Sequence, residues 1–207
     1  MEVVLDVYKR PYSEVNPVIC MDETPKQLIG ETRVPIPQHP GSPAKYDYEY
    51  KRNGVCNIFM ASEPLTGKRY TTVTEFKKKA DWARFVASIA DQYDEADKIT
   101  LVMDNLGTHT IGSFYEVYPP DQAKALIDRF EFIYTPKHGS WLNMAEIELN
   151  VMQKQCLNRR IPSIPLIEME VNAWTDARNG KECRINWQFT THDSRIKLKR
   201  LYPTIEA

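Results

Sequence analysis

Short apolar runs alternate along the chain with longer stretches in which hydrophobic residues recur every three to four positions. The apolar runs are rich in β-branched residues and end at turn residues, which predicts strands over 18–21, 55–61, 68–73, 98–103 and 130–134. The helical period predicts helices over 75–93, 120–129, 141–159 and 166–178. Elements in this order predict an α/β fold, with a mixed sheet flanked by helices.

Capping and turn residues suggest several of the boundaries. The turn at 64–67 predicts that the strands on either side of it form a hairpin. Thr74 and Ser140 are expected to cap the helices that follow them, and Asn179-Gly180 to end the last helix.

Two stretches show neither the strand pattern nor the helical period of hydrophobic residues. Residues 1–16 are expected to form an exposed lead-in, in which 1–8 could add a strand. Residues 25–54 hold several prolines and are too long for a tight turn. They predict an ordered functional loop or a short irregular excursion.

Length and composition fit one soluble globular domain over 1–207. The 207 residues are 42% hydrophobic and 27% charged, which allows a sizeable core. No apolar stretch approaches the ~18 residues of a membrane span and no secretory signal is recognisable, so we expect a cytoplasmic protein without membrane contact. The cysteines are scattered without a C-x-x-C pair, which favours reduced thiols over disulfides or structural zinc.

The net charge of the chain is −1, so the protein does not have the overall positive surface charge by which some proteins bind nucleic acid. Basic residues do cluster at 77–79, at Arg159-Arg160 and over 195–200. Each cluster is either solvated surface or a contact for phosphates, and the sequence leaves both interpretations open.

Three acids stand where metal-dependent chemistry would need them. Asp22 and Asp104 each end a predicted strand, and Glu146 lies near the start of the helix that follows a Pro/Gly loop. Open α/β sheets bind ligands beyond the carboxyl ends of their strands. Mg²⁺ is held by a few carboxylates together with substrate phosphates, and two such ions can stabilise an in-line displacement. Taken alone, Asp104 would equally suit a helix cap.

Three phrases resemble bacterial insertion-sequence DDE transposases of the mariner-related branch, which have an RNase H-like fold. They are C-M-D-E-T at 20–24, M-D-N-L-G-T-H at 103–109 and T-P-K-H-G-S-W-L-N-M-A-E at 135–146. The resemblance implies that Asp22, Asp104 and Glu146 are catalytic and bind two Mg²⁺ or Mn²⁺ ions. It also implies nicking at transposon ends and attack of the freed 3′-hydroxyl on target DNA, without a covalent protein–DNA intermediate.

The resemblance further implies double-stranded DNA as a partner and a homodimer assembled on it. Full-length relatives carry a helix-turn-helix region before the catalytic domain; this chain is expected to lack it, and a separate protein could supply it. Two other functions stay open, an RNase H-like nuclease without strand transfer and a truncated or domesticated remnant that binds DNA without catalysis.

Residues near the three phrases are expected to contact DNA. They are Asn105, His109, Lys137, His138, Trp141, Asn143, Arg159 and Arg160. For the two histidines the alternatives are a structural hydrogen bond, metal ligation or proton transfer. For Trp141 the alternative is packing in the core.

Two further glutamates need a role. On a helical wheel Glu146 lies at the polar edge, whereas Glu148 falls in the apolar arc and would mark either an active site or a partner contact. The family phrase favours Glu146 as the third acid. Glu23, next to Asp22, points to the other side of its strand, where a salt bridge is expected.

Overall fold

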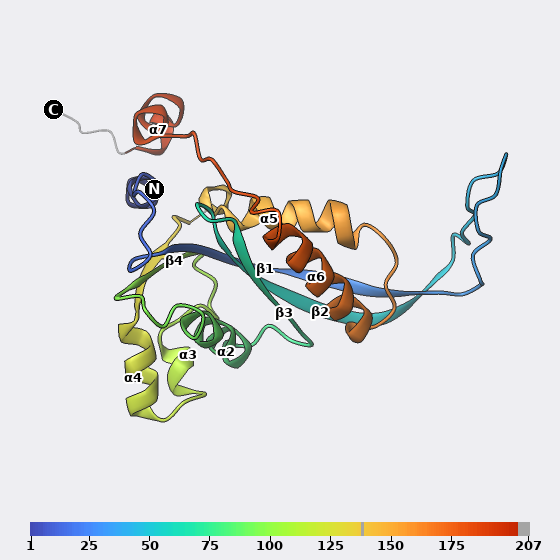
Figure 1. Cartoon of the computed structure of the whole chain (residues 1–207), viewed down its shortest axis with the longest axis horizontal. Helices are drawn as coiled ribbons and strands as arrows, with labels where there is room; N and C mark the ends of the chain where they lie inside the picture. Colours follow the sequence, from blue (N-terminus) through green and yellow to red (C-terminus); the bar gives the residue numbers. More distant parts are fainter. Residues whose placement is uncertain (138, 203–207) are drawn as a thin grey trace.

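The centre of the protein is a five-stranded mixed sheet, seen in a computed structural model that describes residues 1–137 and 139–202 (Figure 1). The strands are β1 (Val18–Glu31), β2 (Tyr50–Glu63), β3 (Lys68–Thr74), β4 (Ile99–Met103) and β5 (Phe130–Tyr134), in the order β3-β2-β1-β4-β5. The first three strands are antiparallel, and β4 and β5 run parallel to β1. The mixed sheet predicted from the sequence is confirmed.

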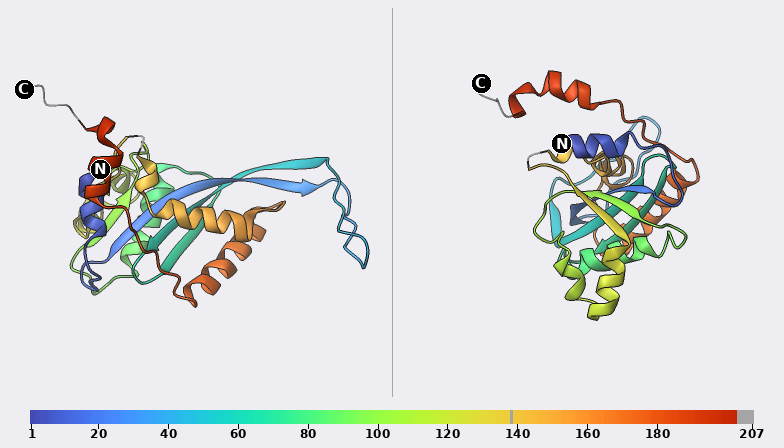
Figure 2. Two further views of the ribbon diagram at one scale, coloured as in Figure 1. Left: turned by 90° about the horizontal axis from the view of Figure 1, so that it is seen from above. Right: turned by 90° about the vertical axis from the view of Figure 1, so that its left-hand side faces the viewer.

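Helices cover both faces of the sheet (Figures 1 and 2). They are α1 (Glu2–Tyr8), α2 (Lys79–Ala90), α3 (Gly112–Tyr115), α4 (Pro120–Asp128), α5 (Ala145–Met152), α6 (Ile164–Asn179) and α7 (Thr191–Lys197). One face packs against α2, α3 and α4, and the other against α5 and α6, with α1 at its end. The predicted arrangement of a sheet flanked by helices is therefore confirmed.

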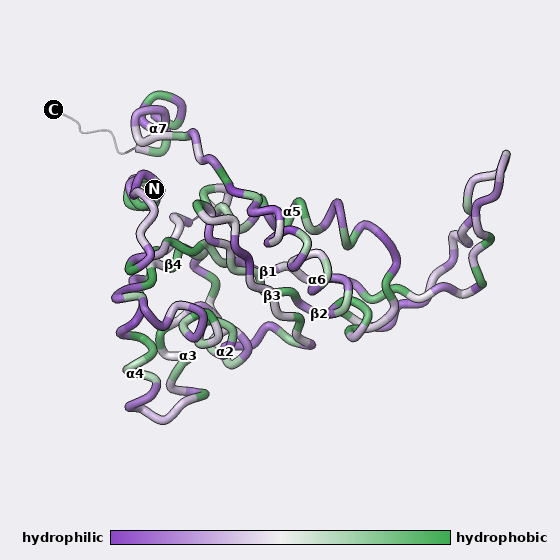
Figure 3. The backbone as a smooth tube through the Cα atoms, viewed as in Figure 1, coloured by the Kyte–Doolittle hydropathy of each residue, from purple (hydrophilic) through white to green (hydrophobic). Residues whose placement is uncertain are grey.

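Alternation along the strands decides which core each side chain joins. On β1, Ile19 and Met21 join the core under α2, whereas Cys20 joins the core under α1. All five residues of β4 are buried, because this strand lies between two neighbours and under helices on both faces. The tube in Figure 3 is correspondingly hydrophobic along β4.

The first two strands are much longer than predicted and form a ribbon that projects from the body (Figure 2). The prediction of a loop over 25–54 is wrong, because only the stretch between Glu31 and Tyr50 lies outside the two strands. The first six residues of β2 are exposed, so this part of the strand has no buried face and no hydrophobic alternation to reveal it.

Two other predictions are wrong, one for the type of the first element and one for the start of a helix. The possible strand at 1–8 is a helix, α1, which buries Val4, Leu5 and Val7. Thr74 belongs to β3 and does not cap a helix, since α2 begins at Lys79.

The helix predicted over 141–159 is divided into shorter pieces. A 3₁₀ turn at Ser140–Leu142 is followed by Asn143 in extended conformation, then by α5 and a π-helical turn at Gln153–Leu157. The break at Asn143 lets this residue turn into the protein, and it is used in the site described below. The short helices α3 and α7 were not predicted, although Thr190 and Asp193 form a capping box that a sequence reading can recognise.

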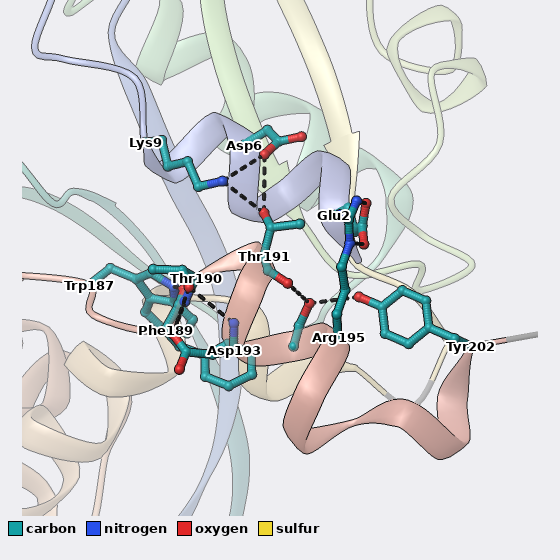
Figure 4. Close-up of polar contacts among 11 residues, drawn as sticks. Glu2, Asp6, Lys9, Trp187, Phe189, Thr190, Thr191, Asp193, Arg195 and Tyr202 are labelled. Atoms are coloured by element: carbon teal, nitrogen blue, oxygen red, sulfur yellow. Dashed lines mark hydrogen bonds and ion pairs between the residues drawn. The ribbon is translucent and has the colours of Figure 1, made fainter.

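The two ends of the described chain lie side by side, because α7 packs against α1 (Figure 4). Arg195 donates two hydrogen bonds to the Glu2 carboxylate, at 2.7 and 2.8 Å, and Thr191 donates one to Asp6. From α1, the Tyr8 hydroxyl donates to the carbonyl of Leu142 at 2.6 Å. The terminal helices therefore support the turn that leads into α5.

Among the described residues, no helix is long and apolar enough to cross a membrane.

Candidate active site

Two of the candidate acids lie together because their strands are parallel neighbours. Cys20 of β1 pairs with Val102 of β4, so Asp22 and Asp104 each stand two residues further along, at the same edge of the sheet. Glu146 is in the first turn of α5, which packs on the same face as Asp22. Parallel pairing and one helix start thus bring residues from three distant segments to one edge.

Both oxygens of Asp22 are held by the protein. Oδ1 accepts the backbone N–H of Glu23 at 2.8 Å, and Oδ2 accepts the side-chain amide of Asn143 at 3.3 Å. Burial raises the pKa of Asp22 to about 7, and the negative charges of Glu23, Asp104 and Glu146 add to the rise. Asp22 therefore lies in a strongly negative environment.

Asp104 is half-buried, and one of its oxygens is tied into the loop that follows β4. Oδ1 accepts the backbone N–H of Leu106 at 3.1 Å and lies 2.7 Å from Nδ1 of His109. Contact with His109 holds the pKa of Asp104 below its usual range, against the opposing effect of burial. The expectation that Asp104 caps a helix is not met, because α3 begins only at Gly112.

His109 is almost fully buried and lies between two carboxylates. Its Nε2 lies 3.0 Å from Oε2 of Glu23, opposite the Asp104 contact. Burial alone would lower the pKa of His109, but Asp104 and Glu23 outweigh it and raise the pKa to about 9. Glu23 also pairs with Lys77 at 3.5 Å, so the salt bridge predicted for Glu23 is present.

The two glutamates of α5 have different environments. Glu146 is half-buried at the edge that holds Asp22. Glu148 is 1% exposed and accepts hydrogen bonds from Arg69 at 2.6 Å and from Arg178 at 2.8 Å. Glu148 is thus too buried for a partner contact and is the centre of a buried ion cluster that joins α5 to β3 and α6.

That ion cluster was missed from the sequence. Arg69 follows a turn in a polar strand and resembles an exposed charge, yet it is 2% exposed. The one signal was the presence of Glu148 in the apolar arc of its helix, since a buried acid requires a buried cation.

The residues expected to contact DNA divide into two groups. Asn105, Lys137, Trp141 and Arg159 are exposed. Trp141 is 43% exposed and touches Phe189 edge-on, so its packing is partial. Arg159 is paired with Glu170, and Arg160 with Glu31, so both arginines already have acidic partners.

His109 and Asn143 form the second group, because their side chains are 0 to 2% exposed and cannot reach a DNA surface. The side-chain amide of Asn143 donates to the Met21 carbonyl at 2.7 Å as well as to Asp22, and its Oδ1 accepts the N–H of Ala145 at 3.2 Å. We assign both residues to the support of the acids instead of DNA contact. His138 lies outside the described residues.

The donor set fits a hard divalent cation. Carboxylate oxygens are the ligands that Mg²⁺ and Mn²⁺ prefer, and Asp22 is a partly buried carboxylate with the negative charges of Glu23, Asp104 and Glu146 near it. Within 1–137 and 139–202, no three His, Cys, Asp or Glu side chains are arranged closely enough to hold a metal ion as they stand. The acids are therefore neighbours in a negative site, and not a closed coordination shell.

Comparison with known proteins gives one family and one fold. The family model described as DDE superfamily endonuclease matches residues 17–167. Among curated proteins, no sequence matches the chain.

Several solved structures have the same fold. A Mos1 mariner paired-end complex with Mn aligns over 88% of this chain, with a TM-score of 0.59 and 15% identity. A Mos1 strand transfer complex aligns over 88% with a TM-score of 0.56 and 16% identity, and a pre-cleavage Mos1 transpososome over 90% with 0.55 and 14%. The aligned parts cover 55%, 53% and 61% of those chains, so this chain spans little more than half of their length.

Proposed function

The chain belongs to the DDE superfamily endonucleases, and from this premise we propose that it is the catalytic domain of a DNA transposase. In this proposal it cleaves transposon ends and joins the freed 3′-hydroxyl to target DNA. The observation that carries the proposal is that Asp22 and Asp104 stand at the same sheet edge, two residues beyond the paired Cys20 and Val102, with Glu146 in the first turn of the helix that packs on the face of Asp22.

The three acids are proposed to hold two divalent cations, Mg²⁺ or Mn²⁺. When bound, such ions supply charge neutralisation at the reacting phosphate and lower the pKa of the attacking hydroxyl or water. The protein contributes positions: Asn143 and the Glu23 N–H orient Asp22, and the loop after β4 orients Asp104. Phosphoryl transfer depends mainly on such positioning and on charge stabilisation.

We propose double-stranded DNA as the partner, bound as a homodimer and recognised through a helix-turn-helix half outside this chain. Within the chain, the exposed Asn105, Lys137 and Trp141 lie on the loops that border the acids and are the best candidates for DNA contact. Arg159 and Arg160 would first have to leave their acidic partners.

A cleavage assay tests the proposal. The chain is incubated with Mn²⁺ and labelled duplexes that carry the terminal repeats flanking its gene, and with pre-cleaved ends plus a target plasmid. We expect nicking and joined products, both abolished by excess EDTA, Asp22→Asn, Asp104→Asn or Glu146→Gln. Asp121→Asn, which removes an exposed acid from the first turn of α4, is the matched control and should be active.

Each other outcome has a definite meaning. Nicking without joined products would favour the nuclease that does not transfer strands. Binding without either product would favour a non-catalytic remnant. Activity that persists in EDTA, or in Asp22→Asn, would contradict the proposed site.

A further inference from the structure

A buried imidazole joins the ends of β1 and β4. His109 follows β4 by six residues and is 2% exposed. Its Nδ1 lies 2.7 Å from Oδ1 of Asp104, and its Nε2 lies 3.0 Å from Oε2 of Glu23 on β1. The ring therefore connects Asp104, a proposed catalytic acid, to Glu23, the residue that follows the proposed catalytic acid Asp22.

The alternation of β1 explains how two adjacent acids have separate roles. Asp22 has the parity of Cys20 and faces Asn143, whereas Glu23 has the parity of Met21 and faces the core under α2. Glu23 is accordingly 4% exposed at its side chain, and both of its cationic neighbours, His109 and Lys77, approach from that side.

The two contacts also fix what His109 can do. Both ring nitrogens lie at ion-pair distance from a carboxylate, Nδ1 from Asp104 and Nε2 from Glu23, so acids of this chain occupy both edges of the ring. The ring is also 2% exposed, so neither nitrogen faces open space from which a metal ion or a substrate could approach it. Of the roles open from the sequence, this arrangement favours a structural one over metal ligation or proton transfer.

The surroundings hold the ring in place. Trp82 stacks on it with ring centroids 5.7 Å apart, and the Tyr134 hydroxyl donates to the His109 carbonyl at 3.1 Å. Because the site is shielded from water, charge contacts within it are stronger than at the surface. The pair is therefore rigid enough to orient a neighbouring carboxylate.

We propose that His109, anchored by Glu23, is a positioning residue that occupies Oδ1 of Asp104 and leaves Oδ2 to face the metal site. The inference rests on the proposed function, because it assumes that Asp104 is a metal ligand. Oδ1 already has the Leu106 N–H and His109, whereas Oδ2 has no hydrogen bond or ion pair with any described residue. Groups that orient metal ligands in this way typically change metal affinity by about 10–100-fold when they are removed.

The test measures Mn²⁺ affinity of the full 207-residue chain by electron paramagnetic resonance of free Mn²⁺, which does not depend on activity. We expect His109→Gln to weaken binding about tenfold or more, and Glu23→Gln to weaken it through loss of the anchor. Because the two residues act as one unit, the double variant should be little weaker than His109→Gln alone.

Ser113→Ala is the matched structural control. Ser113 is fully buried beside the same loop and donates to the Thr108 carbonyl at 3.0 Å, so its removal should lower thermal stability but not Mn²⁺ affinity. Melting curves of all variants separate lost folding from lost positioning. If His109→Gln does not fold, Glu23→Gln decides the question, since it keeps the shape of the anchor and removes only its charge.

Asp104→Asn separates failure of this inference from failure of the proposed function. Weakened binding in Asp104→Asn, together with unchanged affinity in folded His109→Gln or Glu23→Gln, would overturn the positioning role and leave the metal site intact. Unchanged affinity in Asp104→Asn itself would refute the metal site and the positioning role with it.

Discussion

The two glutamates of α5 provide the sharpest prediction, because they are two residues apart and have opposite roles. Glu148→Gln removes the negative charge from a cluster in which Glu148 and Arg69 each have side chains 1% exposed. Glu146→Gln removes a charge from the negative site around Asp22. We expect the first change to destabilise the fold and the second to abolish cleavage.

The magnitude follows from the burial of the cluster. Removing one partner of a buried ion pair costs about 3–5 kcal/mol, because the remaining charge is left uncompensated. Gln keeps a carbonyl that can accept one bond from Arg69 or Arg178, so we take the lower value, about 3 kcal/mol. For a domain of this size each kcal/mol lowers Tm by roughly 2–4 °C, which gives a fall of about 6–12 °C. Glu146→Gln relieves repulsion with Asp22 and should leave Tm unchanged or slightly raised.

Melting curves followed by circular dichroism, combined with the Mn²⁺-dependent cleavage assay, measure both effects. Below its melting temperature Glu148→Gln should still cleave, whereas Glu146→Gln should be folded and inactive. Equal Tm values for Glu148→Gln and the wild type would refute the reasoning on the ion cluster. An active Glu146→Gln with an inactive, stable Glu148→Gln would reverse the assignment of the third acid.

The same pair predicts a pH dependence. Burial alone would raise the pKa of Glu148, but Arg178 and Arg69 outweigh it and hold the pKa below the ordinary 4.5. A carboxyl with a lower pKa in the folded state stabilises the fold above its unfolded value and loses that contribution as pH falls through the folded value. The Tm difference between wild type and Glu148→Gln should therefore be full at pH 7 and narrow below about pH 4.5.

Three further predictions concern other parts of the molecule. Gly67→Ala should lower Tm more than Gly41→Ala: both glycines have positive φ, at 79° and 84°, but an added Cβ would lie 2.7 Å from the Glu182 backbone only at Gly67. Glu2→Gln should lower Tm only slightly, and the Tm difference from the wild type should disappear at high salt, because the pair with Arg195 is exposed and screened. The isolated chain should bind duplex DNA weakly, with a Kd on the order of 10⁻⁴–10⁻⁶ M at physiological salt and little preference for transposon ends in a fluorescence titration.

Hydrophobic pattern and turn residues predicted the elements that lie in the body of the sheet. The strand at 130–134 was predicted with its exact bounds, and those at 68–73 and 98–103 to within one residue at each end. All five residues of β4 and the first residue of β5 are buried, so burial is written into the composition of these two strands, whereas β3 buries only Arg69 and was recognised as the hairpin partner that follows the turn at 64–67. The first six residues of β2 are exposed and the facing end of β1 is buried only at Leu28 and Gly30, so the ladder of backbone hydrogen bonds defines these outer halves and hydropathy does not.

The sequence by itself also determined the family resemblance, and it predicts Glu146 as the third acid, because both depend on residues that stand close together in the chain. Only the tertiary structure decided how the remaining polar residues are used. Glu23 and His109 are 86 positions apart by number, and Glu148 and Arg69 are 79 apart, yet each pair is in contact. A buried charge requires a partner, but no local pattern says which of the many distant charges will supply it; that depends on strand order and on which helix covers which face.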